Sequence, residues 1–383
     1  MLAGFTAFLG LYATQPLLPL LMRAFHATHF AVSLTVTAAT IGVALAAPVI
    51  GRLADVVGRK RVIVGSACVL AAATALASSS TSLPQFVAWR FVQGLATPGI
   101  FAATIAYIHE EWPGSYIGRA TAAYVSGTVV GGFCGRALVG LVASWTSWQM
   151  AFACLAFVNA AAALAIAAFL PSERGSLAER RAEREVRSLA DVVRNPQLAA
   201  TNAVGFCVLF TQVAMFTYVT FYLEAPPFGL STAALGWLFA VYLFGAAVTP
   251  LAGRWIDIKG HRSGLASGVG VGALGSVLAL APGLPIIVVG LALVATGVFI
   301  AQATASSYIG TATQQDRGLA VGVYSTFYYA GGSLGGALPS IVWTRAGWPG
   351  CVLLVIVVQA VTLLIALRAW RVAPTGATPD PNR

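Results

Sequence analysis

Two arginines lie inside long apolar stretches of this 383-residue chain and have the clearest chemical potential. Arg90 falls within the predicted helix 84–107, and Arg136 falls within the predicted helix 118–141. A charge at the centre of a bilayer costs about 2.5–3.5 kcal/mol on the insertion scale and usually marks a functional site. At a rise of about 1.5 Å per residue, both lie roughly 10 Å below the same membrane surface. Two cations at that depth would suit an anionic group of a ligand; alternatively, each caps backbone carbonyls and packs the helices together.

A second group of charges occupies the stretch GRLADVVGRK, which runs from Gly51 to Lys60 between two apolar segments. Its first glycine ends the preceding helix, and Gly58 permits a tight turn in which a side chain would clash. Asp55 places a carboxylate at a membrane–water boundary, where its partners are the N-terminus of a neighbouring helix and a nearby cation. Arg59 is within reach of the acidic pair at 110–111. The alternative interpretation is a simple orientation and stop-transfer loop.

The acidic residues are informative because of where they are absent. The predicted topology puts eleven of the twelve Asp and Glu residues on one side of the membrane, and only Glu224 lies elsewhere. A carboxylate that carries protons across a membrane would be expected near a helix centre, and no predicted helix offers one. Asp55 and Glu224 remain as candidates for proton coupling. Otherwise the substrate itself carries the proton, or Arg90 couples through its ligand.

Enzymatic chemistry has no support in the sequence. No predicted helix carries a nucleophile beside a base or a cluster of metal-binding residues, and no G-x-x-x-x-G-K-[ST] phosphate loop occurs. The five cysteines lie in apolar segments without a C-x-x-C pair, so they are interpreted as small packing residues. We therefore expect no catalytic residues, no metal and no cofactor, and we exclude ATP-driven transport by this chain alone.

Membrane helices must position these side chains, because 58% of the residues are hydrophobic and only 9% are charged. The mean hydropathy of +0.83 requires lipid as the solvent for most of the chain. The apolar runs are unbroken, which favours helices of about 20 residues over barrel strands of about 10. The predicted fold class is an all-α polytopic membrane protein. Its twelve predicted helices are 2–22, 31–51, 61–79, 84–107, 118–141, 149–170, 198–222, 232–252, 263–281, 285–308, 318–341 and 349–370.

The largest polar break divides the twelve helices into six and six. It spans 171–197 and is predicted to be either a helix on the membrane surface or a solvated linker. The predicted domains are thus a first bundle (1–170), this cytoplasmic linker, a second bundle (198–371) and a disordered cytoplasmic tail (372–383).

The positive charges are distributed unevenly across the predicted membrane. With a cytoplasmic N-terminus, the cytoplasmic loops hold 18 of the 22 Lys and Arg residues, and only Arg23 and Arg345 lie on the outer side. This asymmetry fixes the orientation and places both termini in the cytoplasm. A nucleic-acid-binding protein would instead gather its charge on one solvated face, so we exclude that class.

The chain contains an internal repeat. GRLADVVGRKR begins at Gly51 and GRWIDIKGHR begins at Gly253, an offset of 202 residues. GRATAAYVSGTVVGGFCGR begins at Gly118 and GLAVGVYSTFYYAGGSLGG begins at Gly318, an offset of 200 residues. Two separate motifs that repeat at nearly one offset predict two pseudo-symmetric six-helix bundles related by an axis along the membrane normal.

These motifs carry a resemblance to a known family. The loop pattern G-x-L-x-D-x-x-G-R-K is matched by Gly51, Leu53, Asp55, Gly58, Arg59 and Lys60. The helix-four pattern R-x-x-Q-G is matched by Arg90, Gln93 and Gly94. The glycine-rich helix-five pattern of antiporters is matched in part by Gly127, Gly131 and Gly135, with Gly132 replacing a proline and Arg136 replacing the final glycine. Over its whole length the chain resembles the major facilitator superfamily, and YATQPLLPLL and GGFCGR are similar to its YnfM-like, acriflavin-sensitivity branch.

The resemblance implies a gate on the cytoplasmic side. In the family, the loop around Asp55 contacts the start of helix eleven, which here carries Arg317. By the internal repeat, Asp257 would face Arg119 at the start of helix five. Each exposed pair contributes only about 0–1 kcal/mol, which suits contacts that must break whenever the carrier opens inward.

The resemblance also implies a central cavity lined by helices one, four, seven and ten. The substrate or coupling residues that it selects, with the two buried cations, are Tyr12, Gln15, Arg90, Gln93, Arg136, Gln212, Phe216 and Gln302. Hydrogen bonding between helices is the alternative role for each of them. The glycines expected to pack helices closely are Gly127, Gly131, Gly132, Gly135, Gly331, Gly332 and Gly335.

The implied function is secondary active transport of a small organic solute by alternating access, with proton-coupled efflux of a drug, a sugar or an organic anion. The alternatives are an uptake carrier or a uniporter of the same fold, and a non-transporting membrane sensor. The expected partners are a small-molecule substrate, protons and the lipid bilayer. We expect a monomer and no nucleic acid.

Overall fold

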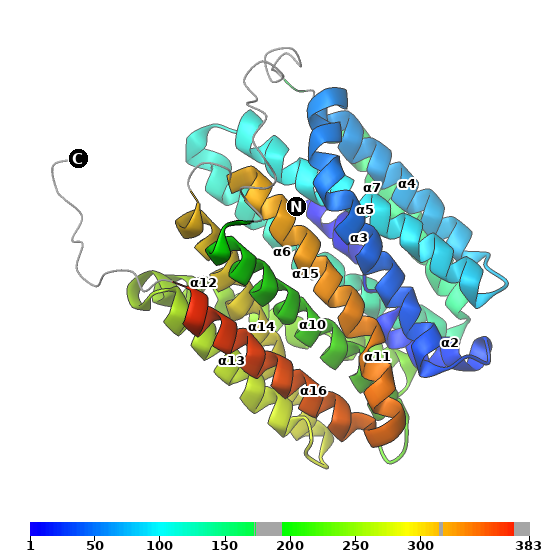
Figure 1. The fold of residues 1–383 in the computed structure, drawn as a ribbon. Coiled ribbons are helices and arrows are strands. Elements are labelled where there is room, and N and C mark those ends of the chain that lie inside the picture. The colour runs from blue at the N-terminus through cyan, green and yellow to red at the C-terminus, as the bar shows by residue number, and fades with distance from the viewer. Residues whose placement is uncertain (172, 174–193, 314–316, 371–383) are drawn as a thin grey trace.

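The structure is a computed structural model that describes residues 1–171, 173, 194–313 and 317–370, and its regular elements are helices (Figure 1). The first half of the chain forms α1 (Leu2–Leu9), the 3₁₀ helix η1 (Gln15–Leu17), α2 (Leu18–Ala24), α3 (His29–Val57), α4 (Arg59–Ser78), α5 (Leu83–Glu111), α6 (Gly114–Trp145) and α7 (Trp148–Phe169). The second half forms α10 (Pro196–Glu224), α11 (Thr232–Leu238), α12 (Val241–Lys259), α13 (His261–Leu278), α14 (Leu284–Ala312), α15 (Arg317–Ala337) and α16 (Pro339–Ala369).

Most of these helices are long enough to cross a bilayer. Within the described residues, nine helices combine sufficient length with sufficient hydropathy to be candidate spans. Large apolar side chains also point outward from the bundle: Phe157 is 75% exposed and Phe169 is 84% exposed. Such side chains require lipid around them, so the chain is a multi-pass membrane protein.

The predicted first helix, 2–22, is wrong as a continuous element. The chain leaves the α-helix after Leu9 and continues through turns and the short helix η1 before α2 begins. Pro16 and Pro19 explain the break, because a proline inside a helix lacks an N–H donor and clashes with the carbonyl four residues earlier. The amides of Ala13 and Gln15 bond instead to carbonyls three residues back, at 3.2 and 3.1 Å.

The predicted helices 232–252 and 318–341 also differ from the structure. The former is interrupted between α11 and α12, where the amides of Ala240 and Tyr242 bond to carbonyls three residues earlier. The latter ends at Ala337, and α16 begins at Pro339 and changes direction at Gly347, whose φ is 57°. A left-handed residue in that position favours glycine, so the turn between the last two spans lies at Gly347.

The two halves repeat one packing arrangement, which confirms the internal symmetry. α3 packs on α5 as α12 packs on α14, α1 packs on α6 as α10 packs on α15, and α4 packs on α7 as α13 packs on α16. A polar contact repeats as well: Asn159 on α7 donates to Thr74 on α4 at 3.4 Å, and Ser276 on α13 donates to Gln359 on α16 at 3.5 Å. These pairs are separated by nearly the repeat offset of the two sequence motifs.

Glycines hold the first helix of each half close to its neighbour. A Cβ on Gly131 would meet the carbonyl of Phe5, and a Cβ on Gly331 would meet the carbonyl of Phe206. A Cβ would likewise meet a backbone carbonyl of the neighbouring segment at Gly127, Gly135 and Gly335. Two of the predicted packing glycines do not contact a neighbouring backbone in this way: Gly132 faces the guanidinium of Arg136, and Gly332 faces the side chain of Leu209.

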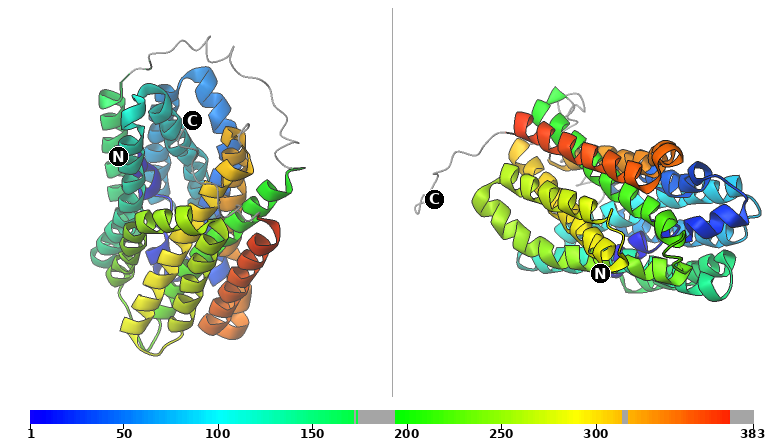
Figure 2. Two further views of the ribbon diagram at one scale, coloured as in Figure 1. Left: turned by 90° about the vertical axis from the view of Figure 1, so that its left-hand side faces the viewer. Right: turned by 90° about the horizontal axis from the view of Figure 1, so that it is seen from below.

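The two halves meet along two pairs of helices. α3 lies beside α15, as Figure 1 shows for the blue and the orange helix, and α6 lies beside α11. Figure 2 gives two further views of the blue-to-cyan and green-to-red halves. We call the end of the molecule that holds the turns at Gly58 and Gly260 the basic end, and the opposite end, which holds Arg23 and Glu224, the far end. Most of the predicted linker and all of the predicted tail lie outside the described residues.

Candidate functional site

A hollow lies between the two halves, with about 550 Å³ of space that is free of protein atoms and partly open to solvent. The first half contributes through the broken first helix and α6, and the second half contributes through α10, α12, α14 and α15. Its lining residues are Phe8, Tyr12, Thr128, Val129, Gly132, Arg136, Leu209, Gln212, Tyr242, Phe299, Tyr328 and Tyr329. The lining is mostly apolar and aromatic, with a few polar groups and one cation.

Arg136 supplies that cation, and it is only 3% exposed. Its Nε donates to the side-chain oxygen of Gln15 at 2.9 Å, and its Nη1 donates to the carbonyl of Gly132 at 2.6 Å. The guanidinium carbon lies 4.6 Å from the ring centre of Phe239, 5.0 Å from that of Tyr12 and 5.1 Å from that of Tyr242. The faces of aromatic rings attract cations, so these three rings partly stabilise the buried charge.

Gln15 joins the two halves beside this cation. Its side-chain oxygen accepts from Arg136 on α6, and its side-chain nitrogen donates to the hydroxyl of Thr217 on α10 at 3.2 Å. The break in the first helix places Gln15 at this point, because it starts η1 where the chain passes between α6 and α10. A movement of one half against the other would therefore disturb the partners of Arg136.

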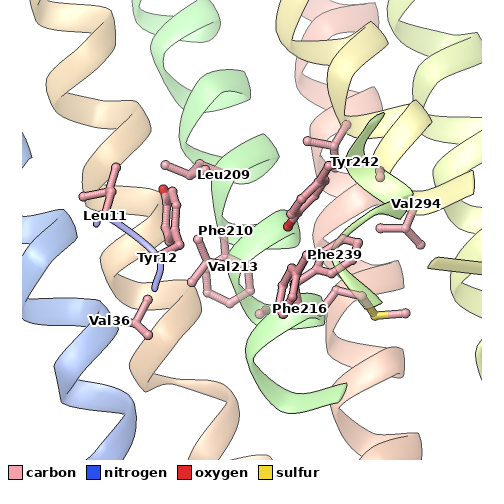
Figure 3. Close-up of a cluster of buried hydrophobic side chains, with 14 of the residues drawn as sticks. Leu11, Tyr12, Val36, Leu209, Phe210, Val213, Phe216, Phe239, Tyr242 and Val294 are labelled. Atoms are coloured by element: carbon pink, nitrogen blue, oxygen red, sulfur yellow. The ribbon is translucent and has the colours of Figure 1, made fainter. Parts of the chain in front are cut away.

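The aromatic side of the site is built by the second half. Phe216, Phe239 and Tyr242 pack together with ring centres 4.5–5.9 Å apart (Figure 3). In the same view, Tyr12 lies on the other side of α10. Phe216 is fully buried in this cluster and supports the rings that face Arg136. The interruption of the predicted helix 232–252 lies at Phe239, so the non-helical turn places one of these rings.

Arg90 belongs to the frame of the first half and does not line the hollow. The side chain is 0% exposed, and it donates to the carbonyls of Gly10 at 2.8 Å and of Leu11, both in the broken first helix. It also donates to the carbonyl of Thr35 on α3 at 3.1 Å and to the side-chain oxygen of Gln93. The capping alternative describes this geometry, because the two arginines have different partners and only Arg136 is among the residues that line the hollow.

The other predicted cavity residues occupy several environments. Gln93 is buried and donates to Thr74 at 3.2 Å, so it binds helix to helix. Gln302 accepts from the hydroxyl of Tyr324 at 3.3 Å. Tyr12 and Gln212 line the hollow as expected from the resemblance. Tyr242, Tyr328 and Tyr329 also line the hollow and were not predicted, because the resemblance restricted the lining to four helices.

The basic end holds a network of charges within the first half. Arg59 is 8% exposed and forms ion pairs with Asp55 at 3.5 Å and with Glu110 on α5, so the expected contact with the acidic pair is present. The carboxylate of Glu173 accepts from the backbone amide of Lys60 at 2.7 Å. Gly58, with φ 103°, forms the turn that brings these groups together. The side chain of Arg317, the expected partner of Asp55 across the halves, lies outside the described residues.

The equivalent turn of the second half has a different partner set. Gly260 repeats the conformation of Gly58, with φ 82°. Next to it, a ring nitrogen of His261 lies 2.7 Å from the hydroxyl of Ser307. Burial holds the pKa of His261 below its usual value, and the nearby carboxylate of Asp257 opposes that shift. The structure thus places Asp257 beside His261; Arg119 lies near the start of α6.

A substitution at Arg59 tests the network of the basic end. Arg59→Gln would leave the carboxylates of Asp55 and Glu110 without their shared cation, and we expect a loss of about 1–3 kcal/mol of stability with a marked loss of transport. Arg61→Gln is the matched control, because it removes the same charge from an exposed side chain two residues away. The check is the temperature midpoint of aggregation in detergent together with flux. Equal midpoints for both variants would contradict the assigned role.

The far end joins the two halves through charge and aromatic packing. Arg23 at the end of α2 pairs with Glu224 at the end of α10, positions 201 residues apart and therefore nearly equivalent in the repeat. The ring of His29 packs against Phe221 at 4.8 Å and Trp343 at 5.4 Å. The sequence carried the signal for the ion pair, because Arg23 and Glu224 are two of the few charges that the topology put on the outer side.

The comparisons with known proteins agree with this geometry. Residues 1–231 and 225–383 match the model of the Major Facilitator Superfamily. An uncharacterised transporter of this type, YybF of Bacillus subtilis, is 30% identical over 369 residues, which are 96% of this chain and 90% of that protein. The inner membrane transport protein YnfM of Escherichia coli is 29% identical over 370 residues, 96% of this chain and 89% of that protein.

Two solved structures share the fold. The nucleoside transporter NupG superposes with a TM-score of 0.79 at 15% identity, covering 97% of this chain and 98% of that one. The human organic anion transporter MFSD10 superposes with a TM-score of 0.71 at 17% identity, covering 95% of this chain and 97% of that one. At these identities the superposition concerns the fold alone.

Proposed function

Because the chain belongs to the major facilitator superfamily, and is thus a secondary transporter and not an enzyme, we propose that it exports a small organic solute in exchange for protons. The hollow between the halves supports this proposal, because it lies where a solute would be exposed to each side in turn. The halves, 1–170 and 198–371, would rock about the solute, with the far end and the basic end opening alternately. A mostly apolar lining with few polar anchors suits a small organic molecule.

Membrane placement follows from the relatives and from the charges. We propose the bacterial inner membrane, because one relative is an inner membrane transport protein of Escherichia coli. The basic end, with Arg59, Lys60, Arg61 and Lys259, would face the cytoplasm, in keeping with the positive-inside rule. Both termini would then be cytoplasmic, and the protein would act as a monomer.

One observation favours a second candidate, a uniporter. Among the described residues, none that lines the hollow is Asp or Glu, so the site itself has no carboxylate to take up a proton. The Glu224 carboxylate lies at the far end in its pair with Arg23. In the antiport proposal the proton would therefore be carried by the substrate itself or bound at Asp55 or Glu224.

Proton movement in inside-out vesicles tests the proposal and separates the two candidates. Vesicles containing the overexpressed protein would be acidified, and then acriflavine, arabinose, uridine and benzenesulfonate would be added separately. We expect one class to discharge the pH gradient only when the protein is present, and Asp55→Asn to abolish this response without changing the amount inserted. Vesicles without the protein provide the background.

The other outcomes are equally definite. Flux of a labelled compound without any proton movement would replace antiport by uniport. Normal discharge by Asp55→Asn would contradict the role of the basic end. No flux of any class, with the protein folded and inserted, would overturn the proposed export.

A further inference from the structure

We propose that Arg136 is a binding site for the anionic group of the substrate, and that the substrate is an organic monoanion with an apolar or aromatic body. This inference deepens the proposed transport function and rests on it only for the use of the site. It depends on three features of the described residues: an uncompensated cation, a lining without acidic groups, and the rings that enclose the cation.

The charge of Arg136 has no counter-ion in the described part of the chain. A guanidinium stays protonated in proteins and carries five N–H donors. The hydrogen bonds of Arg136 go to two acceptors, Gln15 and the carbonyl of Gly132, both of which are neutral. No carboxylate of the described residues lies within ion-pair distance of it. A buried charge without a counter-ion is costly, and bound anions are one way to compensate it.

The contrast with Arg90 shows that burial alone does not explain Arg136. The four acceptors of Arg90 include three backbone carbonyls, two at the break in the first helix and one in α3, so most of its N–H donors are used by the protein. Arg136 keeps donors in excess of its protein acceptors and is also in the lining of the hollow. Three N–H groups would therefore be available to a ligand, which suits two-point recognition of a carboxylate or a sulfonate.

The lining limits the charge of the ligand to one. Arg136 is the single charged residue among those that line the hollow in the described structure, so a second negative charge would be buried without a partner. A cationic solute would meet an unscreened positive charge in a site of low polarity. A neutral solute would leave the cation of Arg136 without a counter-ion from the solute. A monoanion is the class that balances the site.

The rings beside Arg136 select what the anionic group is attached to. Tyr12, Phe239 and Tyr242 lie around the guanidinium, and Phe8 and Phe299 add further apolar surface to the hollow. Apolar area removed from water contributes about 25 cal/mol per Å², so an aromatic or aliphatic body would add affinity here. Because Tyr12 belongs to the first half and Phe239 and Tyr242 to the second, the anion would bind where both halves meet.

Binding in detergent tests the site without depending on transport. The probes are benzenesulfonate, naphthalene-2-sulfonate and naphthalene-1,5-disulfonate, with benzenesulfonamide and phenyltrimethylammonium as neutral and cationic counterparts. We expect titration calorimetry to show the two monoanions binding, the naphthalene compound more tightly. The dianion, the amide and the cation are expected to bind at least about 30-fold more weakly, a ratio typical of a lost buried charge partner.

Two substitutions connect that binding to Arg136. Arg136→Gln removes the charge and is expected to abolish the preference for monoanions. Gln15→Glu nearly preserves the shape of Gln15 but places a carboxylate next to the guanidinium, 2.9 Å away in the present arrangement. This internal counter-ion should also abolish monoanion binding while keeping the fold, so the test survives if Arg136→Gln fails to fold. Arg345→Gln, which removes an exposed arginine near the start of α16, is the control for net charge.

The outcomes separate this inference from the transport proposal. Three results would overturn the anion site. They are equal binding of the neutral probe, unchanged monoanion binding by Gln15→Glu, and no binding of any monoanion at a probe concentration 10-fold above a Kd of about 1 mM. Export of uridine or acriflavine that Arg136→Gln leaves intact would overturn the anion site and keep the transport function. Monoanion binding in detergent with no flux of any compound in vesicles would keep the site and overturn transport.

Discussion

Replacing Arg90 with methionine is expected to reduce the folded protein recovered in detergent several-fold, although Arg90 lies outside the hollow. The substitution removes four hydrogen bonds, three to the carbonyls of Gly10, Leu11 and Thr35 and one to the side-chain oxygen of Gln93. A hydrogen bond to a charged group contributes about 1.5–3 kcal/mol. Methionine avoids the cost of burying a charge in the membrane, which offsets about 2.5–3.5 kcal/mol of this loss of stability. The balance remains destabilising, because four hydrogen bonds to the charged group are lost together.

The prolines of the first helix provide a test of whether Arg90 is needed because that helix is broken. In a regular helix the carbonyl of Leu11 would accept from the amide of Gln15, but that amide bonds to Tyr12 instead. Pro16→Ala removes the ring that prevents the regular pattern. If Arg90 exists to serve the broken helix, Arg90→Met should cost less stability in the Pro16→Ala background than alone. Additive effects, measured as shifts in the aggregation midpoint, would show that Arg90 acts through other contacts.

Arg136→Gln is the comparison variant for Arg90→Met. It also removes a buried arginine from a predicted span, but only two hydrogen bonds are lost, one to the side chain of Gln15 and one to the carbonyl of Gly132. We expect a much smaller loss of folded protein than for Arg90→Met. A similar loss for the two variants would contradict the division into a structural arginine and a ligand-binding arginine.

The helical fold was predictable because its signal is spread over the whole chain. The apolar segments and the two repeated motifs each concern many residues, so errors at single positions do not matter. The helix ends were less predictable: α5 and α14 extend to Glu111 and Ala312, beyond the predicted helices 84–107 and 285–308. Hydropathy reports where lipid ends, whereas a helix continues into water as long as its backbone stays bonded.

The roles of the two arginines could not be ranked from the sequence. Their cost in a bilayer is the same, and the difference lies in which acceptors surround them. Pro16 and Pro19 indicate a break in the first helix, and Arg90 is identified as a donor to carbonyls at that break only once α1 and α3 are known to pack on α5. Likewise, the turn between α11 and α12 places the ring of Phe239 beside Arg136, and hydropathy does not predict that turn.

Substituting leucine for Gly236 is expected to lower transport to near background by holding the far end open. Gly236 on α11 and Gly140 on α6 bring the backbones of the two halves together. A Cβ on Gly236 would meet the carbonyl of Arg136 at 2.7 Å and the Cα of Gly140 at 3.2 Å. Both neighbours are backbone atoms, which cannot rotate away, so the helices themselves must separate.

The expected size of the effect follows from the cost of overpacking. Forcing extra methylenes into a close contact costs about 1–3 kcal/mol. If this cost falls only on the arrangement in which the far end is closed, it shifts the equilibrium between the two arrangements about 5- to 150-fold. The ion pair of Arg23 with Glu224 is partly exposed, so it contributes too little to restore closure.

Cysteine labelling measures the shift directly. Thr217 is 0% exposed, lies between the halves beside Gln15, and would report on the far end as Thr217→Cys in a chain without its five native cysteines. We expect a membrane-impermeant maleimide to modify it several-fold faster in the Gly236→Leu variant. Gly270→Leu is the matched control, because a side chain at Gly270 would meet nothing within 4 Å.

The milder substitution Gly236→Ala separates a conformational effect from misfolding. It adds only the Cβ that meets the carbonyl of Arg136, so it should give an intermediate labelling rate and intermediate transport from a fully folded protein. Because that carbonyl and the guanidinium belong to one residue, displacing α6 from α11 also moves Arg136 away from Phe239. Affinity for the monoanion probes should therefore fall together with closure of the far end. Closure lost with unchanged affinity would mean that the anion is held by the first half alone, and that its binding does not draw the two halves together.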